Sequence, residues 1–237
     1  SPPARKSATV TGFASASRQS CASAGYASSS ARGSTPCDAA LRREGTRVTH
    51  LSTDRGDIDA DAFVLAAGAA SVALARPLGL RLPVYPLKGY SLTLPVTGAS
   101  PQVSVTDFKR KVVYAPLAGG GAGGAQLRVA GMADIAGWSD TPDPVRVAQL
   151  LAEARAAFPQ ATDYAAPLAS MQPWCGLRPA TPTGMPVIGA TPVVNLYLNL
   201  GQGALGWTLA LASGAMVADV IARRPAAVPM DGFTLPA

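Results

Sequence analysis

The chain has 237 residues and a formal net charge of +6, and 48% of its residues are hydrophobic and 14% charged. This composition is typical of a globular protein and excludes a wholly disordered chain. The single histidine, His50, excludes a Ser-His-Asp hydrolase and a histidine-rich zinc site built within the chain. No Lys/Arg run is interleaved with aromatic residues, so the basic charge does not indicate nucleic-acid binding.

The first 37 residues differ from the rest of the chain. They contain no Asp or Glu, are rich in Ser and Ala, and show neither a helical nor a strand period. Such a segment cannot easily bury a core, so we expect residues 1–37 to be disordered. The alternatives are a Ser- and Arg-rich targeting peptide and an aberrant segment that arises from a reading-frame or gene-model error.

From Thr46 onward the pattern predicts short strands and turns. Residues 47–52 alternate like a strand, 54–57 form a turn, and 61–66 form an apolar strand that ends at Ala67-Gly68. A short helix is predicted over 69–79, with Gly79 closing it. Four further strands are predicted over 84–95, 103–107, 112–116 and 126–132.

The remaining elements are two helices and a strand. Pro144 begins a helix that extends to Phe158, with Val147, Leu150, Leu151 and Ala154 on one face. A short strand is predicted over 196–198, and an apolar helix over about 204–222. Because this last stretch contains Gly206, Ser213, Gly214 and Asp219, we predict a buried helix and not a membrane span.

Residues Gly119–Gly124 formally satisfy the spacing G-x-G-x-x-G. A dinucleotide-binding fingerprint needs a strand before the glycines, a helix after them, and an acidic residue about 20 positions on. A further predicted strand follows instead, so a hairpin loop is the better interpretation. We therefore expect the fingerprint to be missing from these 237 residues.

Two glycine-rich blocks near the C-terminus carry the most information. The first runs from Trp174 to Gly189 and reads WCGLRPATPTGMPVIG; the second runs from Asn199 to Thr208 and reads NLGQGALGWT. An arginine held beside proline, such as Arg178, is suited to binding a carboxylate with two hydrogen bonds. A glycine loop that opens a helix presents backbone N–H groups to partial negative charge.

These blocks resemble the C-terminal region of the amine-oxidising flavoproteins, and of the D-amino acid dehydrogenases in particular. Further likenesses are DAFVLAAG at 61–68, PVYPLKGYSL at 83–92 and RVAGM at 128–132. The resemblance covers roughly residues 38–224. It departs from the family pattern at Gln202, where histidine is usual, and at Thr183, where aspartate is usual.

The resemblance implies an α+β (α/β) fold, in which a partial FAD-binding, Rossmann-like layer carries an inserted antiparallel-sheet substrate domain. The expected FAD-binding part comprises residues 38–83 and 175–237, and the expected substrate domain comprises residues 84–174. In the family the dinucleotide fingerprint lies near the N-terminus of the full protein.

The resemblance also implies the site residues. Arg178 is expected to hold the substrate carboxylate, and Tyr90 and Tyr114 are weighed between substrate contact and simple packing. The loop after Leu200 is expected to lie along the pyrimidine edge of the flavin. The cofactor-binding candidates are Gly68, Gly176, Gly201, Gln202, Gly203, Ala204, Leu205, Gly206 and Thr208.

The implied reaction is oxidation of a D-amino acid, by hydride transfer to the flavin of FAD, to an imino acid that hydrolyses to a 2-oxo acid and ammonia. The family passes the electrons to a respiratory acceptor, which implies a cytoplasmic location or peripheral association with the inner face of the plasma membrane. The alternatives are a glycine or sarcosine oxidase-like amine oxidase and a non-catalytic fragment without stable flavin.

Overall fold

The computed structural model describes residues 7–11, 39–54, 56–117 and 124–235. The chain forms two compact units: unit 1 comprises Ser1–Pro86 and Arg178–Ala237, and unit 2 comprises Leu87–Leu177. We expected the chain to cross between the units after residues 83 and 174; in the structure it crosses after Pro86 and after Leu177.

Unit 1 is built on a four-stranded sheet in the order β1-β5-β12-β11. Its strands are β1 (Ser7–Thr11), β5 (Ala62–Ala66), β11 (Val187–Ala190) and β12 (Leu196–Leu200). Strands β1 and β12 both run parallel to β5, and β11 runs antiparallel to β12. A mainly parallel sheet of this kind is expected to be covered on both faces.

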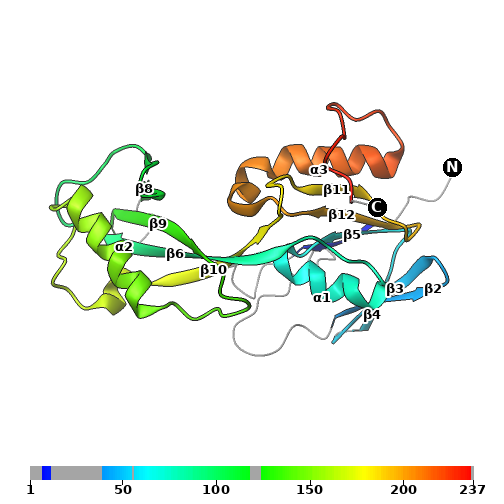
Figure 1. Cartoon of the computed structure of the whole chain (residues 1–237), viewed down its shortest axis with the longest axis horizontal. Helices are drawn as coiled ribbons and strands as arrows, with labels where there is room; N and C mark the ends of the chain where they lie inside the picture. Colours follow the sequence, from blue (N-terminus) through cyan, green and yellow to red (C-terminus); the bar gives the residue numbers. More distant parts are fainter. Residues whose placement is uncertain (1–6, 12–38, 55, 118–123, 236–237) are drawn as a thin grey trace. The chain divides into compact units, whose positions relative to one another are not determined.

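The two faces of this sheet follow the period of two along its strands. Phe63 and Leu65 point into one buried cluster, whereas Val64 between them points into another. Helix α3 (Gly206–Ala222) covers the second face through Met216 and Val217. Figure 1 shows α3 on one side of β11 and β12.

The other face is covered by a small sheet and a short helix. The small sheet has the order β2-β3-β4, and its strands β2 (Ala40–Glu44), β3 (Arg47–Thr53) and β4 (Gly56–Asp59) pair antiparallel. The predicted helix over 69–79 is α1 (Ser71–Ala75) flanked by the 3₁₀ turns Gly68–Ala70 and Arg76–Leu78. Gly79 ends it in the left-handed conformation (φ 77°), as predicted.

Unit 2 is an antiparallel sheet with one helix on it. The sheet order is β10-β6-β9-β8-β7, and the strands are β6 (Tyr85–Pro95), β7 (Val105–Asp107), β8 (Val112–Leu117), β9 (Gln126–Asp134) and β10 (Trp174–Ala180). Helix α2 (Pro144–Ala157) begins at Asp143, whose carboxylate accepts from the N–H groups of Val145 and Arg146. Its Val147, Leu150 and Ala154 pack on the buried face of the sheet.

Three predictions from the sequence can be compared with the structure at this point: the fold class, the disorder of residues 1–37 and the hairpin loop at the glycine run. The α/β fold class is confirmed. Within the segment expected to be disordered, Ser7–Thr11 forms β1, so the expected disorder does not extend to these five residues; residues 1–6 and 12–37 lie outside the described part of the chain. Strands β8 and β9, which flank the glycine run, pair antiparallel; the predicted hairpin loop itself lies largely outside the described residues, which exclude 118–123.

The prediction that the last apolar helix is buried is wrong for most of its surface. The segment Gly203–Ala222 is long and apolar enough to cross a membrane, by length and composition only, with a mean hydropathy of 1.6. Only Ser213, Met216 and Val217 of α3 are buried, because the sheet covers one face of the helix. Two large side chains on α3, Trp207 and Leu211, are 88% and 90% exposed.

Candidate functional site

The candidate site lies where two parallel strands end side by side. Leu196 of β12 is in register with Phe63 of β5, and Leu198 with Leu65. The carboxyl ends of both strands therefore meet at one edge of the sheet, the edge at which α/β domains bind ligands. Each strand passes directly into a glycine turn at this edge, at Gly68 (φ 58°) and Gly201 (φ 85°).

The segment that contains Arg178 lies between these two turns. A Cβ atom on Gly68 would come within 3.9 Å of Pro179 Cγ. A Cβ atom on Gly201 would lie 2.7 Å from Thr181 Cγ2, which is closer than real side chains approach. Pro179 therefore packs on the first turn and Thr181 on the second.

Thr183 stands where the resemblance led us to expect aspartate, and it stabilises a turn. Its Oγ1 accepts a hydrogen bond of 3.2 Å from the N–H of Met185, and Thr181 Oγ1 donates to the Met185 carbonyl at 2.8 Å. Gly184 takes a positive φ of 74° within this turn. Asp and Thr can both accept such a local hydrogen bond, so threonine in place of the usual aspartate is compatible with the same turn.

The loop Gly201–Gly206 also has the G-x-G-x-x-G spacing that the glycine run at 119–124 satisfies formally. Unlike that run, it follows a strand, β12, and opens a helix, α3. We did not predict this match from the sequence. The residues described after α3, 223–235, contain no strand, so the structure shows a strand–loop–helix and not a complete βαβ nucleotide-binding unit.

The start of α3 has no side-chain cap. A 3₁₀ turn over Gly203–Leu205 precedes the helix, and no side chain caps either element. Backbone N–H groups in the first turn of a helix lack partners within the helix and favour negative charge nearby. Ala204, Leu205, Gly206 and Thr208 are exposed there, so these predicted cofactor contacts are accessible in this chain.

Gln202 is held by the preceding strand. Its Nε2 donates a 2.6 Å hydrogen bond to Asn199 Oδ1. An amide carries no net charge, so this position cannot supply the positive charge that a histidine could.

Arg178 is half-buried in β10, directly before Pro179. Burial lowers the pKa of its guanidinium below the ordinary value. An arginine remains charged in spite of such a shift, and a partly desolvated cation binds a carboxylate more strongly than one in bulk water.

Tyr90, a predicted site residue, lies in unit 2, and its hydroxyl is hydrogen-bonded there. Its side chain is buried, and its hydroxyl donates to Asp134 Oδ2 at 3.0 Å. Asp134 also accepts two hydrogen bonds from the guanidinium of Arg146, at 2.9 and 2.7 Å. Burial, and next Asp134, raise the pKa of Tyr90 to about 12.

Tyr114 and Gly176 also have structural partners in unit 2. The Tyr114 hydroxyl donates to the Glu153 carbonyl at 3.3 Å, and its ring packs edge-on against Phe158 with 5.0 Å between centroids. A Cβ atom on Gly176 would collide with the indole of Trp174. Because Tyr90 and Tyr114 pack in the core with engaged hydroxyls, we do not carry them into the proposed site.

Sequence reasoning missed a buried cation in unit 2. Lys88 is 3% exposed, and its Nζ donates to Ser139 Oγ at 3.0 Å and to the Thr141 carbonyl at 2.5 Å. The thiol of Cys175 donates to the nearby Asp140 carbonyl at 2.9 Å, and burial raises its pKa. These bonds fix the segment 139–141. A lysine within the apolar run 84–95 was the only sign of them in the sequence.

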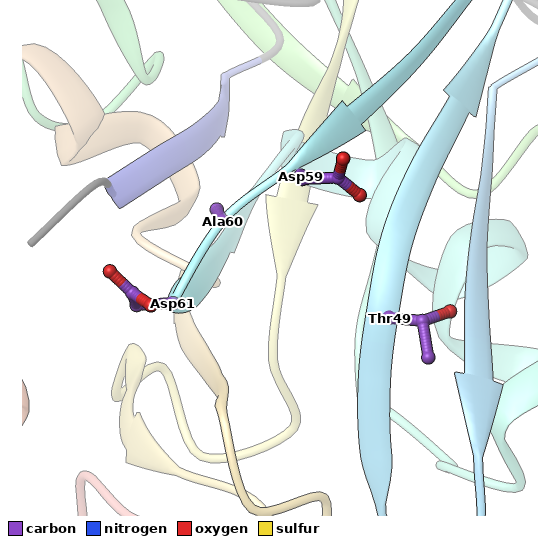
Figure 2. Close-up of a pocket in the computed structure, with 4 residues that line it drawn as sticks. All are labelled: Thr49, Asp59, Ala60 and Asp61. Carbon is purple, nitrogen blue, oxygen red and sulfur yellow. The ribbon is translucent and has the colours of Figure 1, made fainter.

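A hollow of about 200 Å³ lies elsewhere in unit 1 and is lined by Thr49, Asp59, Ala60 and Asp61. Figure 2 draws these four residues as sticks. Asp59 is the last residue of β4 and Asp61 directly precedes β5, and none of the predicted site residues lines this hollow. Among the described residues, no group of three or more His, Cys, Asp or Glu could hold a metal ion. The hollow therefore gives no support for a metal site.

The chain matches the sequence profile of the FAD dependent oxidoreductases over residues 30–220. It belongs to this family.

Similar proteins agree with this assignment. The chain is 48% identical, over 195 residues, to a D-amino acid dehydrogenase of Paramagnetospirillum magneticum, covering 81% of the chain and 44% of that protein. It is 50% identical, over 198 residues, to D-amino acid dehydrogenase 2 of Ralstonia nicotianae, covering 81% of the chain and 45% of that protein. The chain thus spans less than half the length of these curated relatives.

Solved structures share the fold. Glycine oxidase from Geobacillus kaustophilus matches with a TM-score of 0.71 and 24% identity, over 90% of this chain and 54% of that one. L-proline dehydrogenase from P. horikoshii matches with a TM-score of 0.67 and 20% identity, over 82% of this chain and 51% of that one.

The residues of this chain fit one end of the family's cofactor. Gly203 takes a positive φ of 56°, and nothing lies within 4 Å of its missing Cβ, so a flat ring can approach the backbone there closely. The uncapped start of α3 suits the electron-rich edge of such a ring. The adenosine and phosphate end needs a βαβ unit with an acidic residue on the second strand, and the described residues do not contain one.

Proposed function

We propose that this chain forms the flavin-edge and substrate-binding part of an FAD-dependent D-amino acid dehydrogenase. The observation that supports the proposal most directly is the packing of Pro179, the residue after Arg178, on the Gly68 turn that follows β5. The names of the relatives at 48% and 50% identity supply the substrate class.

In this proposal Arg178 binds the substrate carboxylate and orients the amino acid. A bidentate, charge-assisted pair fixes both the position and the rotation of the carboxylate. The loop Gly201–Gly206 and the Gly68 turn hold the flavin end of FAD through backbone groups, and Thr208 adds a hydroxyl. When bound, FAD supplies the hydride acceptor.

No side-chain base is assigned. If the substrate amine arrives neutral, its lone pair assists loss of the α-hydrogen, and water completes the hydrolysis to a 2-oxo acid and ammonia. We further propose that the electrons pass to a respiratory acceptor and that the enzyme works in the cytoplasm, at the inner face of the plasma membrane.

Two alternative functions remain to be separated from this one by experiment. The glycine oxidase fold match favours an amine oxidase that acts on glycine or sarcosine. The coverage of less than half of the relatives favours a non-catalytic part without stable flavin. Flavin content and substrate choice separate the three.

The chain alone is expected to hold FAD weakly. Among the described residues, the glycine turns suit only the flavin end of FAD, and no complete βαβ unit is present to bind its phosphates. Each charge-assisted hydrogen bond to a phosphate contributes roughly 1.5–3 kcal/mol. The 237-residue chain, purified in excess FAD and then desalted, should carry well under one flavin per chain in its visible spectrum. One tightly held flavin per chain after desalting would contradict this account of the missing contacts.

A further inference from the structure

Trp174 lies on the same face of strand β10 as Arg178. Cys175 is 6% exposed and belongs to the core cluster that packs under α2. Because successive side chains of a strand point to opposite faces, Trp174, Gly176 and Arg178 share the face that is turned away from this core. Arg178 is the only charged residue of β10, so the surface beside it is apolar.

The indole of Trp174 lies over Gly176. A Cβ atom on Gly176 would collide with Cη2 of the indole and would lie 2.8 and 2.9 Å from its Cζ2 and Cζ3. The ring therefore leans along the strand in the direction of Arg178. Trp174 nonetheless remains 44% exposed, so the ring covers the glycine with one side and leaves apolar surface open.

The spacing along the strand fits one bound amino acid. Gly176 and Arg178 are two strand residues apart, and the chain itself sets this separation at about 7 Å. A run of four carbon–carbon bonds spans about 5 Å. An amino acid whose carboxylate is held by Arg178 can therefore reach the indole with a side chain of several carbons.

A ring over a glycine also has a simpler explanation. β10 is the edge strand of its sheet among the described strands, and an aromatic side chain commonly covers a glycine in such a strand. Ser91 of the neighbouring β6 favours a ligand surface instead. Tyr90 and Leu92 point into the core, so Ser91 shares the opposite face, and its Oγ is buried without a hydrogen-bond partner among the described residues. Buried hydroxyls are normally satisfied, so this one is left for a ligand or water.

We propose that Trp174, lying on Gly176, contacts the side chain of the substrate and selects D-amino acids with large apolar side chains. An indole offers a large, rigid apolar surface to aliphatic and aromatic groups. β10 offers no second charged group that would pair with a charged side chain. This inference rests on the proposed function, and it adds the residue that chooses among D-amino acids.

Saturation-transfer NMR on the 237-residue chain tests the contact without FAD. The probe is D-phenylalanine at millimolar concentration, and its phenyl protons should receive saturation from the protein. 2-Phenylethylamine has the same ring and amine but no carboxylate. It should receive much less saturation, because Arg178 cannot anchor it.

Matched variants locate the contact. Trp174→Ala should remove most of the phenyl saturation, whereas Trp174→Phe should keep it, because phenylalanine also presents a flat apolar ring. Gly176→Ala should reduce the saturation as well, since the added methyl group displaces the indole. Trp138→Ala, at another half-exposed tryptophan of unit 2, should leave it unchanged. Thermal melts check that each variant is folded.

Substrate preference supplies the second readout. It is measured in the flavin-loaded complex of this chain with the part of the Paramagnetospirillum magneticum relative that the chain does not match. Trp174→Ala should lower kcat/KM for D-phenylalanine by about tenfold or more and that for D-alanine by less than about threefold, since a methyl side chain makes little contact with the ring.

The outcomes separate this inference from the proposed function. Phenyl saturation that is missing from the wild-type chain, retained in Trp174→Ala or removed by Trp138→Ala overturns the proposal. An equal loss of kcat/KM for both substrates also overturns it, because a purely structural cover would act on both alike. If the NMR contact behaves as expected while the flavin-loaded complex oxidises no D-amino acid, the apolar subsite stands and the proposed function fails.

Discussion

Replacing Arg178 by Met should lower kcat/KM for a D-amino acid about 30- to 900-fold, since the loss of a desolvated, charge-assisted contact costs on the order of 2–4 kcal/mol. The enzyme to assay is the flavin-loaded complex of this chain with the part of the Paramagnetospirillum magneticum relative that the chain does not match, either mixed with it or fused to it. Arg178→Lys should recover little of the loss, because an ammonium cannot form the bidentate pair.

The decarboxylated substrate provides the internal control. Ethylamine lacks the carboxylate of D-alanine, so its slow oxidation should proceed at the same rate in the wild-type enzyme and in the Arg178→Met variant. Arg155→Met, at an exposed position of α2, should leave kcat/KM for D-alanine unchanged. Wild-type kcat/KM for D-alanine in both Arg178 variants would remove this residue from the site.

The substitution Gly201→Val should destabilise unit 1 by about 2–5 kcal/mol, the sum of about 1–2 kcal/mol of left-handed backbone strain and about 1–3 kcal/mol of overpacking. Gly201 has a φ of 85°, and its missing Cβ would lie 2.7 Å from Thr181 Cγ2 and 3.4 Å from the Val187 nitrogen. Valine adds two methyl groups beyond that Cβ. Urea unfolding followed by circular dichroism measures the free-energy change.

Gly203 is the matched control for this prediction. It also has a positive φ, 56°, but nothing lies within 4 Å of its missing Cβ. Gly203→Val should therefore cost only the backbone strain, about 1–2 kcal/mol. Equal effects at the two glycines would mean that the close packing of Gly201 on the 181–187 segment does not contribute to stability.

The sequence predicted the elements whose local signals are strong. Helix α2 begins at Pro144 as predicted, with Asp143 as its cap and Val147 and Leu150 on its buried face. Strands β6, β8 and β9 lie within two residues of their predicted bounds, because long apolar or alternating runs leave few alternatives.

The strands that were missed have weak local signals. Strand β11 is only Val187–Ala190 and contains Gly189, and β10 contains Gly176 and Pro179. Such residues weaken a strand in isolation, and pairing with neighbours decides the outcome. The pairing of β1 with β5 joins segments about fifty residues apart, which a local pattern cannot show.

The candidate site could be predicted only in part, because a local sequence pattern does not show tertiary contacts. The resemblance identified Arg178 and the glycine loop, but the contacts of Pro179 with Gly68 and of Thr181 with Gly201 depend on tertiary packing. A period of two could not say which face of its strand Tyr90 or Tyr114 occupies. The structure places both on the core face, with their hydroxyls on protein acceptors.

Stereospecific oxidation tests the central claim most directly. In the flavin-loaded complex described above, dye reduction is measured with D-alanine, L-alanine, glycine and sarcosine at equal concentrations. The account predicts rapid turnover of D-alanine, release of pyruvate and ammonia, and turnover of the other three at least about tenfold slower, a difference of roughly 1.4 kcal/mol. Preferred oxidation of glycine or sarcosine, or no oxidation of D-alanine by a complex that holds flavin, would contradict it.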